Sequence, residues 1–254
     1  MPVGNACFDD ADDFYLRKSS GNYPDYFVPV DGEFNVDGGK WYSIWVELAP
    51  NGNCVGKSTL SVGLEGVDSN VSRKEIEIEV IDAELPKQDL IFTNWFHSDC
   101  LCNYYGVEPF SDEFWRICKN FVKTAVDHGM NCILTPIFTP PLDTRIGGER
   151  RTVQLVKVRR HGGKYYFDFR NLRKWISMCR ECGIEYFEMS HLFTQWGAKH
   201  APKIVAIDRK GREKKIFGWL TKTSSKEYDS FLRMFAAGLI KVIDSEGIRE
   251  KCFF

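Results

Sequence analysis

The sequence has no excess of charge of either sign, no long apolar run and no regular cysteine framework. Its 34 Lys and Arg balance 35 Asp and Glu, giving a net charge of -1 that favours neither a nucleic-acid partner nor a strongly basic one. No apolar stretch approaches the roughly 18 residues of a membrane-spanning helix, so no membrane insertion is expected. The opening residues, MPVGNACFDD, lack the charged and apolar segments of a signal peptide, which favours a cytoplasmic location.

The cysteines indicate reduced thiols. There are nine, an odd number with irregular spacing, which does not fit a set of disulfides. Cys179 and Cys182 form a Cys-x-x-Cys inside a helical pattern, without a second pair at zinc-site spacing. Cys100 and Cys102 are too close together for ordinary tetrahedral ligation from one turn. The sequence therefore predicts no metal site and no cofactor.

The remaining composition is that of a folded globular protein. Hydrophobic residues make up 43% of the chain and charged residues 27%. Aromatic residues reach 14%, with 19 Phe, 10 Tyr and 7 Trp. This content favours a large core, and some of the rings could instead line a cleft for a sugar or another ligand.

Residues 1–86 carry strand patterns and little helical pattern. In three stretches, apolar and polar residues alternate or β-branched and aromatic residues are frequent. They are Lys40–Leu48, Ser58–Leu64 and Glu75–Ile81. Turn-forming residues separate them, as at Asp37-Gly38-Gly39. The block predicts a portion of a β-sandwich, and its small size predicts that this sandwich is incomplete.

After a linker at 85–88 the pattern changes to alternating strands and helices. Strands are expected over Leu90–Phe96, Asn131–Phe138, Ile184–Phe193 and Arg249–Phe254. Helices are expected from Ser111 to about His128, over Leu172–Glu181, and from a Ser224/Glu227 capping box to Gly247. The repeated order helix, glycine, strand is typical of a parallel sheet. We therefore expect residues 87–254 to form the first part of a (β/α)8 barrel, truncated in its fourth strand.

Two insertions interrupt the repeating units. Thr152–Phe169 predicts a hairpin around His161-Gly162-Gly163. Gln195–Leu220 is a long basic and aromatic loop. Long loops that follow parallel strands are usually functional, so the second insertion is expected to take part in binding.

Several motifs resemble the glycoside hydrolases of family 123 and an overlapping family of uncharacterised domains. They are YFEMSHLFTQWGAKHAPKI over Tyr186–Ile204, NYYGVEPF over Asn103–Phe110, and FTNWFHSD after the linker. The resemblance implies a β-sandwich followed by a (β/α)8 barrel. It also implies release of terminal β-linked N-acetylgalactosamine from glycans or glycolipids by a retaining mechanism. The 2-acetamido group of the substrate is then the nucleophile, assisted by an adjacent Asp-Glu pair.

The resemblance places this Asp-Glu pair at the end of the fourth barrel strand, just beyond Phe254. We therefore expect no catalytic carboxylate in the chain and no activity from it alone. Asp112-Glu113 is also adjacent, but it follows Ser111, where acidic residues complement a helix dipole. Asp244 and Glu246 end a helix and precede the next strand, whereas barrel active sites form where strands end.

The strand ends supply candidate sugar-binding residues, because aromatic rings stack on sugar C–H faces and polar groups bind hydroxyls. The candidates are Trp95, His97, Asp99, Glu188, His191, Trp196, Lys199 and His200, with Thr135, Thr139, Ser190 and Gln195 near them. Trp95 and His191 could equally serve the core. Glu188 is the only carboxylate within an expected strand, and it could bind a sugar hydroxyl or pair with a lysine or arginine.

Two functions stay open at this stage. One is part of a glycosidase for terminal β-linked N-acetylhexosamine, with a glycan or glycolipid as the substrate. The other is a non-catalytic carbohydrate-binding or structural relative. An Asp-Glu pair within a few residues after Phe254 would support the enzyme, and apolar or small residues there would support the binding protein.

Overall fold

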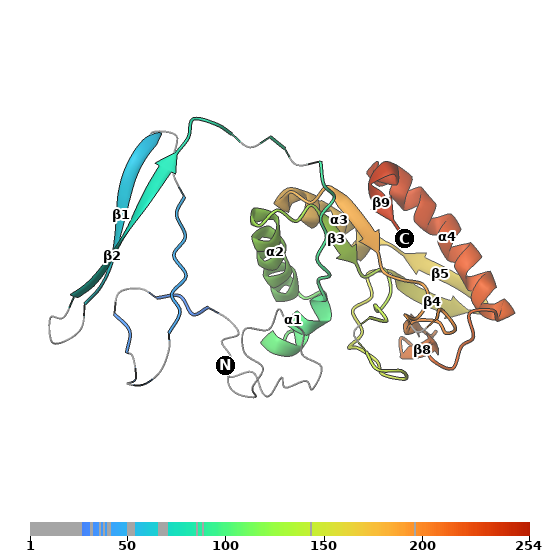
Figure 1. The fold of residues 1–254 in the computed structure, drawn as a ribbon. Helices are drawn as coiled ribbons and strands as arrows, with labels where there is room; N and C mark the ends of the chain where they lie inside the picture. The colour runs from blue at the N-terminus through green and yellow to red at the C-terminus, as the bar shows by residue number, and fades with distance from the viewer. Residues whose placement is uncertain are drawn as a thin grey trace. The chain divides into compact units, whose positions relative to one another are not determined.

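A computed structural model describes the chain from residue 27 to residue 254, except for residues 31, 32, 36, 38, 40, 41, 50–53, 66–70, 85, 88, 143 and 196. The chain divides into two compact units, Met1–Pro86 and Lys87–Phe254 (Figure 1).

The described part of the first unit is built around one β-hairpin. β1 (Gly56–Glu65) and β2 (Val71–Val80) pair antiparallel, with Leu60 opposite Ile76. These strands confirm the two alternating patterns at Ser58–Leu64 and Glu75–Ile81. The strand expected at Lys40–Leu48 is wrong for its described residues, 42–48, which join no β-ladder and have exposed side chains. Aromatic and β-branched residues favour a strand only where a neighbouring strand takes up the backbone hydrogen bonds.

The second unit contains a parallel sheet in the order β3-β6-β9. β3 (Cys132–Thr135) pairs parallel with β6 (Tyr186–Met189), and β6 pairs parallel with β9 (Cys252–Phe253). Thr93 makes a parallel bridge to Cys132 on the outer side of β3. The parallel arrangement of the four predicted segments is therefore confirmed, although the last strand is short and follows a 3-10 turn, Arg249–Lys251.

The segment expected to be a strand at Leu90–Phe96 forms only that single bridge. The side chain of Asn131 explains this difference. Its Oδ1 accepts a hydrogen bond from the Phe92 amide at 2.8 Å, and its Nδ2 donates to the Leu90 carbonyl at 2.9 Å. A side-chain amide thus replaces part of the main-chain ladder at this edge.

Three helices lie near this sheet. α2 (Asp112–Asp127) begins at Ser111, whose hydroxyl accepts a hydrogen bond from the Phe114 amide at 3.2 Å. α3 (Arg170–Cys182) ends at Gly183 in the left-handed conformation. Both helices confirm the predicted elements. α1 (Ser98–Tyr105) was not predicted, because its eight residues, SDCLCNYY, lack a side-chain cap and contain few strong helix formers.

The two insertions form a second sheet, which we call the insertion sheet, in the order β5-β4-β7-β8. β4 (Lys157–His161) and β5 (Lys164–Asp168) are the predicted hairpin, turning at two glycines with positive φ. β7 (Ile204–Ile207) and β8 (Glu213–Phe217) lie in the segment predicted only as a loop. β7 adds to β4 in parallel, so a contact between distant segments creates this strand.

α4 (Lys226–Glu246) packs on one face of the insertion sheet, beside β4 and β5 in Figure 1. Rings of Phe231 and Phe235 meet those of Tyr165 and Phe167, and Phe217 joins from β8. Much of the high aromatic content therefore builds the core, as composition favoured. Within the described residues, no helix is long and apolar enough to cross a membrane.

The cap of α4 is one residue later than predicted. The N-cap residue is Ser225, not Ser224, and its hydroxyl accepts a hydrogen bond from the Tyr228 amide at 3.4 Å. Glu227 does not close a capping box. Its carboxylate instead accepts hydrogen bonds from Arg160 and from the Tyr165 hydroxyl.

Replacing Ser225 with alanine should therefore lower the free energy of unfolding by about 1 kcal/mol, the usual cost of losing a side-chain cap. Urea titration followed by far-ultraviolet circular dichroism measures this change. Ser224→Ala is the matched control and should have little effect. Equal effects of the two substitutions would contradict the assignment of the cap.

Candidate functional site

Three predicted site residues meet at the carboxyl ends of the parallel strands. Trp95 lies two residues after the bridge at Thr93, and Glu188 lies near the end of β6. The indole Nε1 of Trp95 donates to both carboxylate oxygens of Glu188, at 3.1 Å each. The ring of His191 stands edge-on to Trp95, with their centroids 5.6 Å apart. The structure thus joins an aromatic ring, a carboxylate and an imidazole from two segments that lie on either side of β3, the one bridged at Thr93 and β6.

The exposure of this cluster decides between the two roles considered for Trp95, packing in the core and contact with a sugar. Its side chain is 47% exposed, so it is not a core residue in these 254 residues. The carboxylate of Glu188 is half-buried and holds the indole instead of a lysine or arginine. The Nδ1 atom of His191 is buried and has no hydrogen-bond partner among the described residues. Such an unpaired buried nitrogen is costly, and a ligand or ordered water could satisfy it.

Ser190 and Thr135 position the loops that carry this cluster. The Ser190 hydroxyl donates to the Phe138 carbonyl at 3.1 Å, and the Phe138 amide donates to the Ser190 hydroxyl oxygen at 3.3 Å. The Ser190 amide donates to the Thr135 carbonyl at 2.9 Å. Both Thr135 and Ser190 are buried. They therefore tie the end of β3 to the end of β6, which fixes His191 beside Trp95.

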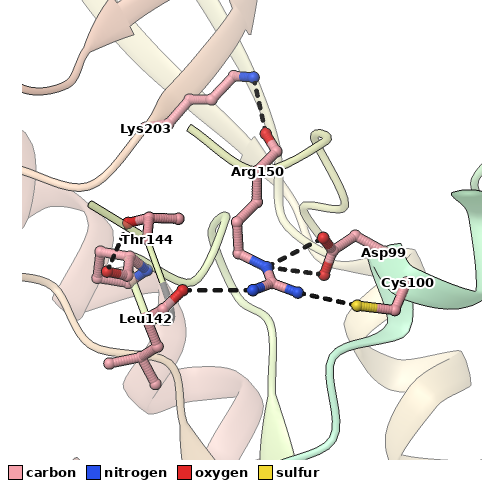
Figure 2. A network of polar contacts seen from close by, with 7 residues as sticks. Asp99, Cys100, Leu142, Thr144, Arg150 and Lys203 are labelled. Atoms are coloured by element: carbon pink, nitrogen blue, oxygen red, sulfur yellow. Dashed lines mark hydrogen bonds and ion pairs between the residues drawn. The ribbon is translucent and has the colours of Figure 1, made fainter. Parts of the chain in front are cut away.

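Asp99 lies in a buried ion pair with Arg150. The Arg150 guanidinium donates through Nε to the Asp99 oxygens at 3.0 and 3.2 Å (Figure 2). The side chain of Arg150 is 11% exposed and that of Asp99 is 6% exposed. The same guanidinium donates to the Leu142 carbonyl and to Cys100 Sγ. Asp99 therefore connects α1 to the segment after β3, and its carboxylate is already occupied. His97 is the residue that precedes α1, and its backbone carbonyl accepts the hydrogen bond from the Cys100 amide.

A second group of charges holds the end of this segment. Lys203 Nζ donates to the Arg150 carbonyl at 3.1 Å, as Figure 2 shows, and lies 3.6 Å from the Glu149 carboxylate. Lys215 of β8 also binds Glu149, and this hydrogen bond lowers the pKa of the Glu149 carboxyl below its ordinary value. These pairs link residues 149–150 to the insertion sheet.

The other predicted residues lie on the segment 194–203. His200 is bridged through its backbone to Lys222, and its ring lies 5.7 Å from that of Trp219. Gln195 donates to the Thr144 carbonyl at 3.2 Å. Lys199 is exposed, and its backbone carbonyl accepts from the Thr223 amide. Trp196, another predicted sugar-binding residue, lies outside the described residues.

A small interior cavity opens between this segment and the one after β3. Thr139 and Thr194 line it, and both side chains are buried with hydroxyls that lack a partner within the described chain. Its volume of about 10 Å³ leaves room for at most one ordered water. Thr139 therefore belongs to the support of the loops.

The buried thiols of Cys118 and Cys179 serve packing. Burial raises the pKa of the Cys118 thiol to about 12 and the pKa of the Cys179 thiol well above its ordinary value. Both thiols therefore stay protonated at neutral pH, whereas a nucleophile or metal ligand would be a thiolate. In the part of the chain that the structure describes, no three His, Cys, Asp or Glu side chains gather in a way that could hold a metal ion.

In the two acidic pairs at helix ends, Glu113, Asp244 and Glu246 each bind an arginine. Glu113 lies in the first turn of α2 and binds Arg116, which lowers the pKa of the Glu113 carboxyl. Asp244, at the end of α4, binds Arg249. Glu246, also at that end, binds Arg173 of α3.

The prediction from sequence did not include Arg150 and Trp219. Arg150 lies 51 positions from Asp99, so no local pattern joins them, and the one available signal was that a buried aspartate needs a cation. Trp219 donates through Nε1 to the Gly148 carbonyl at 2.7 Å. Both residues support the segment 139–151.

Comparisons with known proteins agree on one family. Residues 95–254 match the family model described as "Glycoside hydrolase 123, catalytic domain". Among solved structures, the chain resembles a family 123 glycoside hydrolase from Clostridium perfringens, studied for glycolipid glycan hydrolysis, with a TM-score of 0.62 and 14% identity. The match covers 79% of this chain and 36% of the other, so the chain spans about a third of the length of that structure. No curated protein matches.

Proposed function

The chain belongs to glycoside hydrolase family 123, and we propose that residues 87–254 form the sugar-binding first part of a (β/α)8 catalytic barrel. The parallel order β3-β6-β9 and the flanking helices support this placement. We propose further that residues 1–86 contribute a portion of a β-sandwich, which the hairpin β1-β2 supports. The substrate class we propose is a terminal β-linked N-acetylhexosamine, with N-acetylgalactosamine favoured, on a glycan or glycolipid.

The cluster of Trp95, Glu188 and His191 carries this proposal. Its exposed indole offers a flat face for the C–H side of a sugar ring, as aromatic rings do in ligand sites. The Glu188 oxygens and the unpaired His191 Nδ1 provide polar groups for hydroxyls. All three residues lie at the carboxyl ends of parallel strands, where barrel active sites form.

We propose that the remaining predicted residues divide between binding and support. Lys199 and His200 belong to the segment that borders the sugar site, together with His97 before α1. Trp196, which lies outside the described residues, stays a sugar-binding residue proposed from the sequence alone. Asp99 supports the site through Arg150, because its carboxylate already accepts two hydrogen bonds from that guanidinium. The assignment of Asp99 as a direct sugar ligand is therefore replaced by a positioning role.

The mechanism we propose is the retaining, substrate-assisted route of the family. In it, the acetamido oxygen attacks the anomeric carbon, one carboxylate orients the acetamido N–H, and a second carboxyl protonates the leaving oxygen. Glu188 is committed to Trp95 and has no adjacent aspartate, so it binds and positions the sugar in this scheme. We therefore expect the Asp-Glu pair to lie outside this chain and the chain alone to show no turnover.

The test measures binding and turnover separately. The chain should bind methyl 2-acetamido-2-deoxy-β-galactoside, detected by ligand-observed NMR. Trp95→Ala should weaken this binding at least about 10-fold, because ring stacking is lost from the sugar face. Tyr104→Ala, which removes another exposed ring in the same unit, is the control and should leave the affinity unchanged.

Turnover of an aryl 2-acetamido-2-deoxy-β-galactoside by the same protein decides the role of Glu188. Turnover that Glu188→Gln abolishes would overturn the binding role and make Glu188 a catalytic acid. Equal affinity for a β-galactoside without the acetamido group would favour the alternative, a general carbohydrate-binding relative.

A further inference from the structure

The insertion sheet has two faces of different character. One face carries Val158, Tyr165 and Phe167 and packs on α4. Side chains alternate along each strand, so the residues between these point to the opposite side. We call that opposite side the basic face and define it by Lys157, Arg159, His161, Tyr166, Ile207 and Arg209.

The basic face is hollowed. Its residues line a depression of about 710 Å³, a volume within the range of small-molecule sites. The strand register places Arg159 of β4 opposite Tyr166 of β5 on one side and opposite Ile207 of β7 on the other. A cation therefore lies at the centre, between an exposed aromatic ring and an apolar side chain. The Tyr166 side chain is 56% exposed, so the ring can contact a ligand.

Nearby acids do not neutralise this charge. The carboxylate of Asp208 accepts hydrogen bonds from the Lys210 and Arg212 amides at 2.8 and 3.0 Å, and these bonds help to lower the pKa of the Asp208 carboxyl. Asp168, which lies opposite Lys157 in the register of β4 and β5, binds Arg170 at 2.6 Å. Both acids are thus engaged in turns or helix starts.

Two arginines are left available for a ligand. Arg159 makes no ion pair and no side-chain hydrogen bond with any described residue. Its side chain is also exposed, so its guanidinium is available to a ligand. Arg209 donates through Nε to His161 Nδ1 at 3.1 Å, which orients the guanidinium and leaves its terminal nitrogens free of other described partners. Planar guanidinium groups bind carboxylate and sulfate oxygens with two parallel hydrogen bonds.

We propose that the basic face binds an acidic glycan, with a sulfate or carboxylate on Arg159 and Arg209 and the adjoining sugar ring on Tyr166. A glycan fits better than a nucleic acid for two reasons. The depression offers one exposed ring instead of the series that stacks successive bases, and the chain as a whole has a net charge of -1. This binding site is separate from the strand-end cluster and does not depend on the hydrolysis proposed there.

The test uses the 254-residue protein and a chondroitin 4-sulfate hexasaccharide, titrated by calorimetry. The matched sugar is the same hexasaccharide after desulfation and carboxyl reduction, which removes charge and keeps the backbone. Binding of the acidic form should weaken as salt rises, because exposed charges are screened. The uncharged form should bind at least about 10-fold more weakly, since the charge-assisted hydrogen bonds are lost.

Two double variants distinguish binding at the basic face from a general effect of positive charge on the protein. Arg159→Gln with Arg209→Gln should weaken binding of the acidic hexasaccharide by about 10-fold or more, through loss of two ligand contacts. Lys123→Gln with Lys241→Gln removes the same charge from exposed positions on α2 and α4 and should change the affinity less than about twofold, since distant exposed charges are screened. Circular dichroism should show all proteins folded.

Other outcomes overturn the proposal. They are equal losses in the two double variants, undiminished binding of the uncharged hexasaccharide, and no binding of the acidic one. Tighter binding of a single-stranded DNA oligonucleotide of equal charge would assign the face to nucleic acid. Unchanged binding by Tyr166→Ala would remove the sugar from the contact and leave a simple anion site, which also contradicts the proposal.

Discussion

Replacing Arg150 with methionine should lower the free energy of unfolding of the second unit by about 3–5 kcal/mol. The substitution leaves the carboxylate of Asp99 buried without its counter-ion, and breaking one side of a buried pair is strongly destabilising. It also removes hydrogen bonds to the Leu142 carbonyl and Cys100 Sγ (Figure 2). Urea titration followed by circular dichroism at helix wavelengths reports on this unit, because every described helix lies in it.

The double variant Asp99→Asn with Arg150→Met is the control for the buried charge. Its loss of stability should be smaller than that of Arg150→Met, because no ionised group stays unpaired. Equal losses in the single and double variants would mean that the guanidinium acts through the Leu142 and Cys100 contacts alone. A loss below about 1 kcal/mol in the single variant would show that the pair behaves as an exposed one.

The same substitution links stability to the site. Arg150 joins α1 to the segment 139–151, and Gln195 contacts this segment at the Thr144 carbonyl. Loosening Arg150 should therefore also disturb the segment that carries His200. Arg150 therefore supports the sugar site, although it does not contact Trp95 or Glu188.

Local patterns predicted the elements whose causes are local. The helix at Asp112–Asp127 has its cap, its apolar stripe and its end within one stretch of sequence. The hairpin β4-β5 has two glycines at the required turn. Where a distant group takes part, the pattern was insufficient. The side chain of Asn131 occupies backbone groups at Leu90 and Phe92, and β7 exists because it pairs with β4.

The same distinction holds for the candidate site. Trp95, Glu188 and His191 could be grouped from sequence because the ends of parallel strands meet at one edge of a sheet. Their mutual contacts agree with that grouping. The role of Asp99 could not be predicted, because its partner is 51 positions away and only the fold brings them together. The basic face was missed because the strand that completes it was expected to be a loop.

Replacing Phe231 with alanine should lower the free energy of unfolding by about 3–5 kcal/mol, the loss that is typical for a fully buried phenylalanine. Its side chain is 0% exposed and lies at the centre of an aromatic cluster. Ring centroids lie 4.9 Å away at Phe217, 5.0 Å at Tyr165 and 5.7 Å at Phe138. The substitution removes the ring and leaves a cavity that this rigid group of neighbours can only partly fill.

Met234→Ala on the same helix is the matched control. Met234 is 36% exposed, so its loss should cost less than about 1 kcal/mol. Hydrogen exchange then tests how far the cluster reaches. Phe217 and Tyr165 belong to the insertion sheet, whereas Phe138 follows β3 of the parallel sheet. Amides of both sheets should therefore lose protection together in Phe231→Ala. Loss confined to α4 would mean that the two sheets are stabilised independently, and that the basic face can be altered without disturbing the sugar site.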